Sequence, residues 1–214
     1  MARLTYNPAI FDVTDLESAK RIILTPEPDT GTEERWRRET PYIAAQLGAH
    51  LMPQPDQTIL DFGCGIGRLS KELIERHGCR VIGVDISASM RAMALDYVAS
   101  DRFAALSPEE LAGQVAAGLR VDGAFSCWVI QHALDPVAAL EQIRAAMAPG
   151  ARLFVANAHL RCVPVVEGAW GRDGIVVRTV LEQMFRPMSL GALDPTWVGE
   201  NTAATSFWGV YALR

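Results

Sequence analysis

Three glycines at alternate positions follow an apolar run that ends in an acid, in the stretch ILDFGCGIGRLS (59–70). Glycines let the backbone turn tightly and approach a ligand closely. A dinucleotide loop, GxGxxG, would have its third glycine at position 68, which is Arg68, and a phosphate-binding P-loop would continue with a lysine. Asp61 stands two residues before the glycines, where it would repel a pyrophosphate. The loop therefore favours a cationic ligand.

A second acid, Asp85, ends the apolar stretch VIGVDIS (81–87). A carboxylate at the tip of the second strand of a parallel sheet can accept hydrogen bonds from both hydroxyls of a ribose. The two acids and the glycine loop together predict a site for a ligand with a ribose and a positive group. S-adenosylmethionine, with a sulfonium and an ammonium, meets that description.

The elements that must position these residues alternate along the middle of the chain. Short apolar segments at 58–62, 80–85, 102–106, 121–127 and 151–157 predict strands, and helical patterns occupy 66–77, 88–98, 108–117 and 136–148. Continuous apolar strands joined by crossover helices indicate a parallel sheet covered on both faces. The predicted fold is α/β, a doubly wound and mostly parallel sheet with a helical N-terminal cap.

The flanking regions carry weaker signals. Residues 1–52 form a predicted helical cap or lid. Thr14 and Glu17 have the spacing of a capping box, and Thr32 is placed to cap a helix. Thr40 followed by Pro41 predicts the start of a further helix. Residues 53–157 form the predicted cofactor-binding core. Residues 158–214 form a substrate-side segment of the same domain, with a loop over 159–174, a helix over 177–185, a closing strand over 206–214, and no assignment for 186–205.

Residues 57–157 resemble a class I S-adenosylmethionine-dependent methyltransferase, because DFGCGIG, VIGVDIS and VDGAFSCWVIQHALDP occur in the order typical of that superfamily. The resemblance implies that Asp61 and the loop hold the methionine end, that Asp85 binds the ribose, and that Ser107 stands where the family often has an acid for the adenine amino group. Ser107 is also a complete N-cap. The cofactor-binding residues implied are Asp61, Gly63, Cys64, Gly65, Asp85, Ile86, Met90, Ser107, Ser126, Cys127, Trp36 and Arg35.

Candidates for acceptor chemistry lie near the ends of the later strands. His132 follows the fourth strand and is a candidate general base, although packing explains it equally well. His159 is a second catalytic candidate, and Tyr6, Asn157 and Arg161 are candidate substrate-binding residues. Trp36 and Arg35 lie on a helix that could close over the site, with the arginine on the methionine carboxylate. The alternative is a buried anchor beside a solvated basic face.

Composition excludes several classes of protein. The 214 residues carry a net charge of −5 with two lysines among them, which argues against a nucleic-acid partner. No apolar run approaches the ~20 residues of a membrane helix, and the first residues lack the apolar core of a secretory signal, so we expect a cytoplasmic protein. Four cysteines without a CxxC pair indicate neither a zinc site nor a disulfide framework, and no metal is expected.

The predicted function is S-adenosylmethionine-dependent methyl transfer to an oxygen or nitrogen of a small organic molecule, by positioning for in-line displacement. The segment SCWVIQH after the fourth strand differs from the [DNS]PP[YFW] loop of enzymes that methylate exocyclic amines of DNA bases. Two alternatives remain open: a non-catalytic domain that binds S-adenosylmethionine or a partner, and an NAD-dependent oxidoreductase. The sequence leaves the acceptor and the oligomeric state undetermined.

Overall fold

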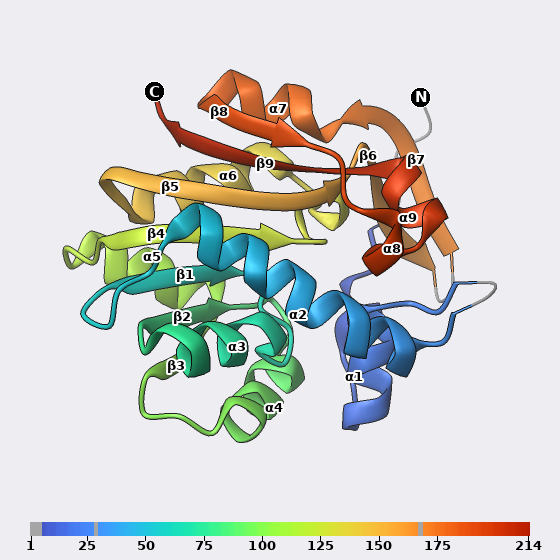
Figure 1. Ribbon diagram of the computed structural model, residues 1–214, viewed down its shortest axis with the longest axis horizontal. Coiled ribbons are helices and arrows are strands. Elements are labelled where there is room, and N and C mark those ends of the chain that lie inside the picture. Colours follow the sequence, from blue (N-terminus) through green and yellow to red (C-terminus); the bar gives the residue numbers. More distant parts are fainter. Residues whose placement is uncertain (1–5, 28–29, 167–168) are drawn as a thin grey trace.

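A seven-stranded sheet forms the centre of the protein, whose computed structural model describes residues 6–27, 30–166 and 169–214 (Figure 1). The strand order is β3-β2-β1-β4-β5-β9-β8. Strands β1 (Thr58–Phe62), β2 (Arg80–Val84), β3 (Phe103–Leu106), β4 (Val121–Cys127) and β5 (Met147–Ala158) pair in parallel. Strand β9 (Ser206–Leu213) runs antiparallel between β5 and β8 (Phe185–Gly191). The predicted doubly wound sheet is confirmed.

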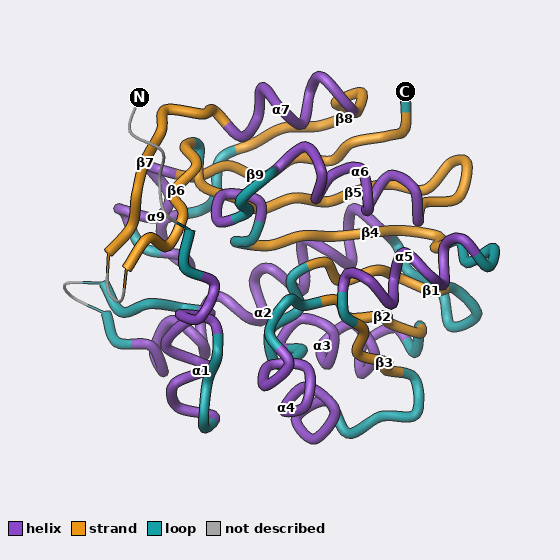
Figure 2. Tube along the Cα trace, turned by 180° about the vertical axis from the view of Figure 1, so that it is seen from behind, coloured by secondary structure: helices purple, strands orange, loops and turns teal. Residues whose placement is uncertain are grey.

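Helices cover both faces of the sheet. Figure 1 shows α2 (Thr32–Leu51), α3 (Arg68–His77) and α4 (Ala88–Val98) on the near face, and Figure 2 shows α5 (Pro108–Ala116) and α6 (Pro136–Ala146) on the far face. Helix α7 (Val177–Met184) joins the far-face core through Leu181. Fully buried Phe125 and Phe154 pack on the near-face helices, while Leu153 and Val155 pack on the far side. Burial of both faces explains the continuous apolar strands.

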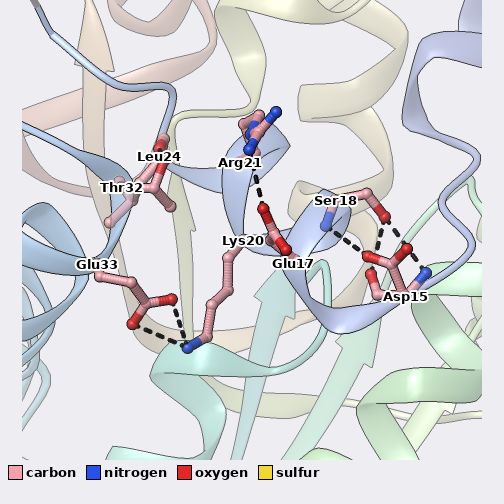
Figure 3. Close-up of polar contacts among 8 residues, drawn as sticks. All are labelled: Asp15, Glu17, Ser18, Lys20, Arg21, Leu24, Thr32 and Glu33. Atoms are coloured by element: carbon pink, nitrogen blue, oxygen red, sulfur yellow. Dashed lines mark hydrogen bonds and ion pairs between the residues drawn. The ribbon is translucent and has the colours of Figure 1, made fainter.

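The N-terminal segment is helical, as predicted, but its caps differ from the expected ones. The 3₁₀ helix η1 (Pro8–Phe11) precedes α1 (Leu16–Ile23), and the capping box of α1 joins Asp15 and Ser18, one residue later than predicted. Lys20 of α1 pairs with Glu33 of α2, and the Thr32 hydroxyl donates to the carbonyl of Leu24 at 3.0 Å (Figure 3). These contacts hold α1 against the start of α2.

The predicted helix start at Thr40 is wrong, because α2 runs unbroken from Thr32 to Leu51 with Pro41 inside it. The Thr40 hydroxyl accepts a hydrogen bond from Arg68 of α3 at 3.2 Å instead of capping a helix. Ile43 and Leu47 are fully buried under α2. Burial of this face stabilises the helix enough to offset the one backbone hydrogen bond that a proline removes.

The segment after β5 is more ordered than its sequence indicates. Strands β6 (Leu160–Val166) and β7 (Ala169–Val176) form a separate antiparallel sheet where a loop was predicted. The unassigned region contains β8 and two short helices, α8 (Pro195–Val198) and α9 (Glu200–Thr205). Figure 1 shows β6, β7, α1, α8 and α9 gathered beyond the carboxyl ends of the parallel strands. Across the described ranges, no helix combines the length and apolar character needed to span a membrane.

Candidate functional site

A cavity of about 1020 Å³ lies at the carboxyl ends of the strands, between the glycine loop and the β6–β7 sheet. Ligands of doubly wound folds bind at this edge. Eleven of the seventeen residues predicted for the site line it: Asp61, Gly63, Cys64, Gly65, Asp85, Ile86, Met90, Cys127, Arg35, Tyr6 and His132. The other six, which are Trp36, Ser107, Ser126, Asn157, His159 and Arg161, lie outside the lining.

Two positions of the glycine loop require glycine, because their backbone conformation is left-handed and neighbouring side chains leave no room for a Cβ. Gly63 and Gly65 have φ of +83° and +52°. A Cβ at Gly63 would meet Val129 at 2.2 Å, and a Cβ at Gly65 would meet Ile23 at 2.8 Å. The Gly63 amide donates to the carbonyl of Val84 at 2.7 Å, which ties the loop to the end of β2. The loop therefore offers its backbone to the cavity on a fixed scaffold.

Asp61 is a buried carboxyl at the end of β1. It is 4% exposed, and it accepts a hydrogen bond from the Ser70 hydroxyl at 2.7 Å. Burial raises the pKa of Asp61 to about 7, and the nearby Asp85 adds to the increase. A cation in the cavity would oppose both effects, because an opposite charge favours the ionised form. The arrangement is suited to a positively charged ligand.

Asp85 holds the loop and still faces the cavity. Its two carboxylate oxygens accept the backbone amides of Gly65 and Ser87, each at 2.9 Å. Burial raises the pKa of Asp85, and these two amides lower it. A carboxylate has about four acceptor sites, so two amides leave capacity for the hydroxyls of a ligand.

Two buried polar atoms on the cavity wall lack partners within the described part of the chain. They are the indole Nε1 of Trp128 and the amide Oε1 of Gln142. Trp128 also has φ of +64°, a left-handed conformation that is rare for a side chain of this size. Buried polar groups are normally hydrogen-bonded, and each exception needs an explanation. Neither atom has accessible surface toward the cavity, so the structure leaves both polar groups buried without a partner.

His132 lies in the 3₁₀ helix η2 (Ile130–His132), near two aromatic rings. Its ring centroid is 4.7 Å from that of Trp170 and 6.3 Å from that of Phe11. Nδ1 is 2.7 Å from the carbonyl of Cys162, so it carries the proton, and the bare Nε2 is 3.1 Å from the side-chain nitrogen of Gln131. Burial lowers the pKa of His132 to about 4, so the ring is neutral at pH 7.

Three predicted residues outside the lining support the strands and helices. The Ser126 hydroxyl donates to the carbonyl of Phe62 at 2.9 Å. Ser107 caps α5 in a capping box with Glu110. Asn157 is fully buried, and its side-chain oxygen accepts a hydrogen bond from the backbone amide of Gln131 at 3.3 Å. Their polar atoms are engaged in holding the structure together.

The remaining predicted residues have structural partners. Arg161 donates to the carbonyl of Ala133 at 2.8 Å and pairs with Asp173. His159 stacks on Phe207 at 5.5 Å between centroids. Trp36 packs edge-on against Tyr97 at 6.1 Å. These side chains brace the walls of the cavity.

Arg35 lines the cavity, but its donors are engaged within α2 and the adjoining loop. Its Nε is 2.6 Å from the carboxylate of Glu39, which is fully buried, and its Nη1 donates to the carbonyl of Thr25 at 2.5 Å. Burial raises the pKa of Glu39, and the neighbouring guanidinium of Arg35 opposes the increase. A buried pair of this kind fixes the position of α2 beside the glycine loop.

Several lining residues were not predicted from the sequence. Phe11, Trp170 and Arg172 line the cavity from η1 and β7, and Gln142 lines it from α6. Exposure alternates along the first residues of β7, as in a strand, but its sequence AWGRDGIV does not alternate between apolar and polar residues and so gives no signal for one. Gln142 has no local signal, because its burial arises from packing between helices.

Comparison with known proteins agrees with this geometry. Residues 31–193 match the family described as methyltransferase domain, and the chain belongs to that family, within the class I S-adenosylmethionine-dependent methyltransferase superfamily. The match begins in α2 and extends beyond β8, so it covers both the glycine loop and the β6–β7 sheet.

Curated relatives are similar over part of their length. O-methyltransferase resE of Aspergillus sclerotiorum is 29% identical over 132 residues, which are 60% of this chain and 50% of the relative. N-demethylindolmycin N-methyltransferase of Streptomyces griseus is 36% identical over 108 residues, or 47% of this chain and 44% of the relative. The chain thus spans about half the length of the curated relatives it matches.

Solved structures share the fold at low sequence identity. Geranyl diphosphate C-methyltransferase from Streptomyces coelicolor A3(2), in complex with Mg²⁺, geranyl diphosphate and S-adenosyl-L-homocysteine, superposes with a TM-score of 0.63 at 15% identity, covering 98% of this chain and 89% of that one. A SAM dependent methyltransferase from Aquifex aeolicus gives 0.63 at 15% identity, over 94% and 100%. The fold is that of class I methyltransferases.

Proposed function

We propose that this protein is an S-adenosylmethionine-dependent methyltransferase that acts on an oxygen or nitrogen of a small organic molecule. The observation that carries the proposal is the pair of carboxyls that line the cavity on either side of the glycine loop, the buried Asp61 and the half-buried Asp85. Membership of the methyltransferase family supports it.

The residues present fit the cofactor. Asp61 suits the ammonium of the methionine end, Asp85 retains acceptor sites for the ribose, and Gly63 and Gly65 keep the backbone clear of side chains. S-adenosylmethionine, when bound, supplies a methyl group already activated by its sulfonium.

The residues of this chain position the acceptor and exclude water. Both ring nitrogens of the neutral His132 are engaged, Nδ1 with the carbonyl of Cys162 and Nε2 with the side-chain nitrogen of Gln131. With a pKa of about 4 it is a weak base, about six units below the pKa of ~10 of a phenol. His132 therefore supplies an aromatic surface to the cavity and does not remove a proton. An acceptor that is already nucleophilic, such as a neutral amine or an ionised oxygen, suits this site.

Calorimetry with three ligands tests the proposal. S-adenosylmethionine and S-adenosylhomocysteine should bind, and NAD should not, because Asp61 disfavours a pyrophosphate beside the glycine loop. Binding of NAD without binding of S-adenosylhomocysteine would support an oxidoreductase instead.

A transfer assay separates an enzyme from a binding domain. The donor carries a labelled methyl group, and the acceptors are aromatic and aliphatic amines, phenols and acids. Label should pass from the donor to at least one acceptor. Cofactor binding with no transfer to any acceptor class would favour the non-catalytic alternative.

A further inference from the structure

We propose that the acceptor is an aromatic molecule that bears a carboxylate, and that Arg172 of β7 binds that carboxylate. This inference rests on the proposed function and adds the class of acceptor to it. The evidence is the face that the β6–β7 sheet presents to the cavity, the aromatic rings around His132, and the charge that Arg172 brings there.

The register of the β6–β7 sheet determines which side chains share a face. Cys162 is opposite Arg172, and Pro164 is opposite Trp170, without a register shift between these two pairs. Directly opposed residues of an antiparallel pair project to the same side, and successive residues project to opposite sides. Cys162, Trp170 and Arg172 all line the cavity. The face that carries Arg172 is therefore the one turned toward the cavity.

The opposite face of this sheet is anchored to the protein. Arg161 donates to the carbonyl of Ala133 and pairs with Asp173, so both charges on that face are engaged. Val163 is fully buried. The backbone amide of Asn7 donates to the carbonyl of Pro164 at 2.8 Å, which joins the N-terminal segment to the same sheet. The sheet is held on one side, and its other side forms a wall of the cavity.

The wall beside Arg172 is aromatic. The ring centroid of His132 is 4.7 Å from that of Trp170 and 6.3 Å from that of Phe11. Trp170 remains 37% exposed although it lines the cavity, so part of its ring is available for contact. Aromatic rings pair in stacked or edge-on geometry with centroids about 4.5–7 Å apart. A planar ring is the chemistry that such a wall binds best.

Arg172 is an exposed cation of the cavity lining, and its surroundings differ from those of Arg35 and Arg68. Arg35 forms an ion pair with Glu39. Arg68 donates a hydrogen bond to the hydroxyl of Thr40, and the nearby carboxylates of Glu39 and Asp61 favour its charged form. The guanidinium of Arg172 makes no hydrogen bond or ion pair with any residue in the ranges 6–27, 30–166 and 169–214. A guanidinium offers a planar fork of donors that matches a carboxylate. An aromatic acid would satisfy both the ring wall and this charge.

The test compares an aromatic acid with its neutral amide. Indole-3-acetate and indole-3-acetamide have nearly the same shape and differ in charge. Each is titrated by calorimetry into the full chain saturated with S-adenosylhomocysteine. The acid should bind about tenfold or more tightly than the amide, because a charge-assisted pair forms with one of them alone. Equal affinity for the two probes, or binding of neither, overturns the proposal.

Variants locate the preference. Arg172→Gln should abolish the preference for the acid and leave S-adenosylhomocysteine affinity unchanged. The matched control is Arg186→Gln, at an exposed arginine of β8 outside the cavity lining, and this variant should retain the preference for the acid. Trp170→Leu should weaken both probes by a similar factor, because it removes ring contact and no charge. A preference that survives Arg172→Gln assigns the selectivity to solvent-facing charge elsewhere and overturns the proposal.

The outcomes distinguish this inference from the proposed function. Failure of S-adenosylhomocysteine to bind the wild-type protein would refute the methyltransferase proposal, whatever the probes do. Binding of S-adenosylhomocysteine together with equal affinity for acid and amide would refute the acceptor class alone. Loss of S-adenosylhomocysteine binding in Arg172→Gln would place Arg172 on the cofactor and also refute its role at the acceptor.

Discussion

Replacement of Asp61 by asparagine should make the protein more stable at neutral pH. Burial raises the pKa of Asp61 to about 7 in the folded state, while an unfolded aspartate has a pKa of about 3.9. Between these values the folded protein holds a proton that the unfolded chain has released. The free energy of unfolding therefore falls as the pH rises, by about 1.4 kcal/mol per unit, and the loss is complete above about pH 7.

The size of the effect follows from that interval. Asparagine does not titrate, and its Oδ1 can still accept from the Ser70 hydroxyl, which is 2.7 Å from Asp61 in the wild type. Two pH units separate pH 5 from the folded-state pKa. The difference in free energy of unfolding between Asp61→Asn and wild type should thus increase by about 2–3 kcal/mol, in favour of the variant, from pH 5 to pH 8.

Urea unfolding followed by circular dichroism at pH 5 and pH 8 measures this difference. Other titrating groups, such as Glu39 and His132, are common to both proteins and largely cancel. Asp122→Asn, at an exposed aspartate that accepts from the Thr58 amide, is the control and should retain the pH dependence of the wild type. A difference between variant and wild type that is the same at both pH values would refute the reasoning.

The same variant should bind S-adenosylmethionine less tightly, in spite of its greater stability. A bound cation keeps Asp61 ionised, so binding to the wild type releases a proton below about pH 7, and affinity should rise with pH in that range. Calorimetry in buffers of different ionisation enthalpy detects that proton. Proton release that persists in Asp61→Asn would assign it to another group.

Four further predictions concern the loop and the cavity wall. Asp85→Asn should weaken S-adenosylhomocysteine binding by about 1.5–3 kcal/mol, and unchanged affinity would disprove contact with the ribose. Gly63→Ala should lower the free energy of unfolding by more than ~1 kcal/mol, because φ is +83° and Val129 leaves no room for a Cβ. Gly113→Ala, which places a methyl group in open space on α5, should raise the free energy of unfolding by about 0.5–1 kcal/mol. Urea unfolding of the two variants measures both changes. The pH profile of kcat/KM should show no inflection from His132 between pH 5.5 and 8, because the ring is neutral throughout that range. An inflection in this range that disappears in His132→Gln would show that the ring does titrate there. Gln142→Leu should leave cofactor affinity unchanged and stability within about 1 kcal/mol of wild type, because it removes a buried oxygen that has neither accessible surface nor a partner among the described residues; a larger loss of stability would show that the amide has a structural role.

The core of the fold could be predicted because its signals are local. The segments 58–62 and 121–127 match β1 and β4, and 88–98 matches α4. Asp61 and Asp85 could be identified because each ends an apolar strand beside a glycine loop, and both line the cavity. In these places the order of residues alone decides what lies at the edge of the sheet.

The errors came from interactions between distant segments. Pro41 indicates a helix start by local rules, but packing of α2 against α3 keeps the helix continuous. Asn157 near the end of β5 and Arg161 in β6 stay predictions as site residues, and their side chains bond to the segment after β4. The β6–β7 sheet was missed because its buried face contains Arg161, whose burial depends on Asp173 and on carbonyls from another part of the chain.

The two sides of the cavity are encoded in different ways. The residues proposed to face the cofactor lie mostly within one stretch, from Asp61 to Met90, whereas the opposite wall combines Phe11 with strands β6 and β7, which lie far from it in the sequence. Substitutions in residues 160–176 can thus alter selectivity without disturbing the glycine loop. This separation makes the scaffold readily evolvable: directed evolution or exchange of that segment between relatives can change the acceptor while the methyl donor stays the same.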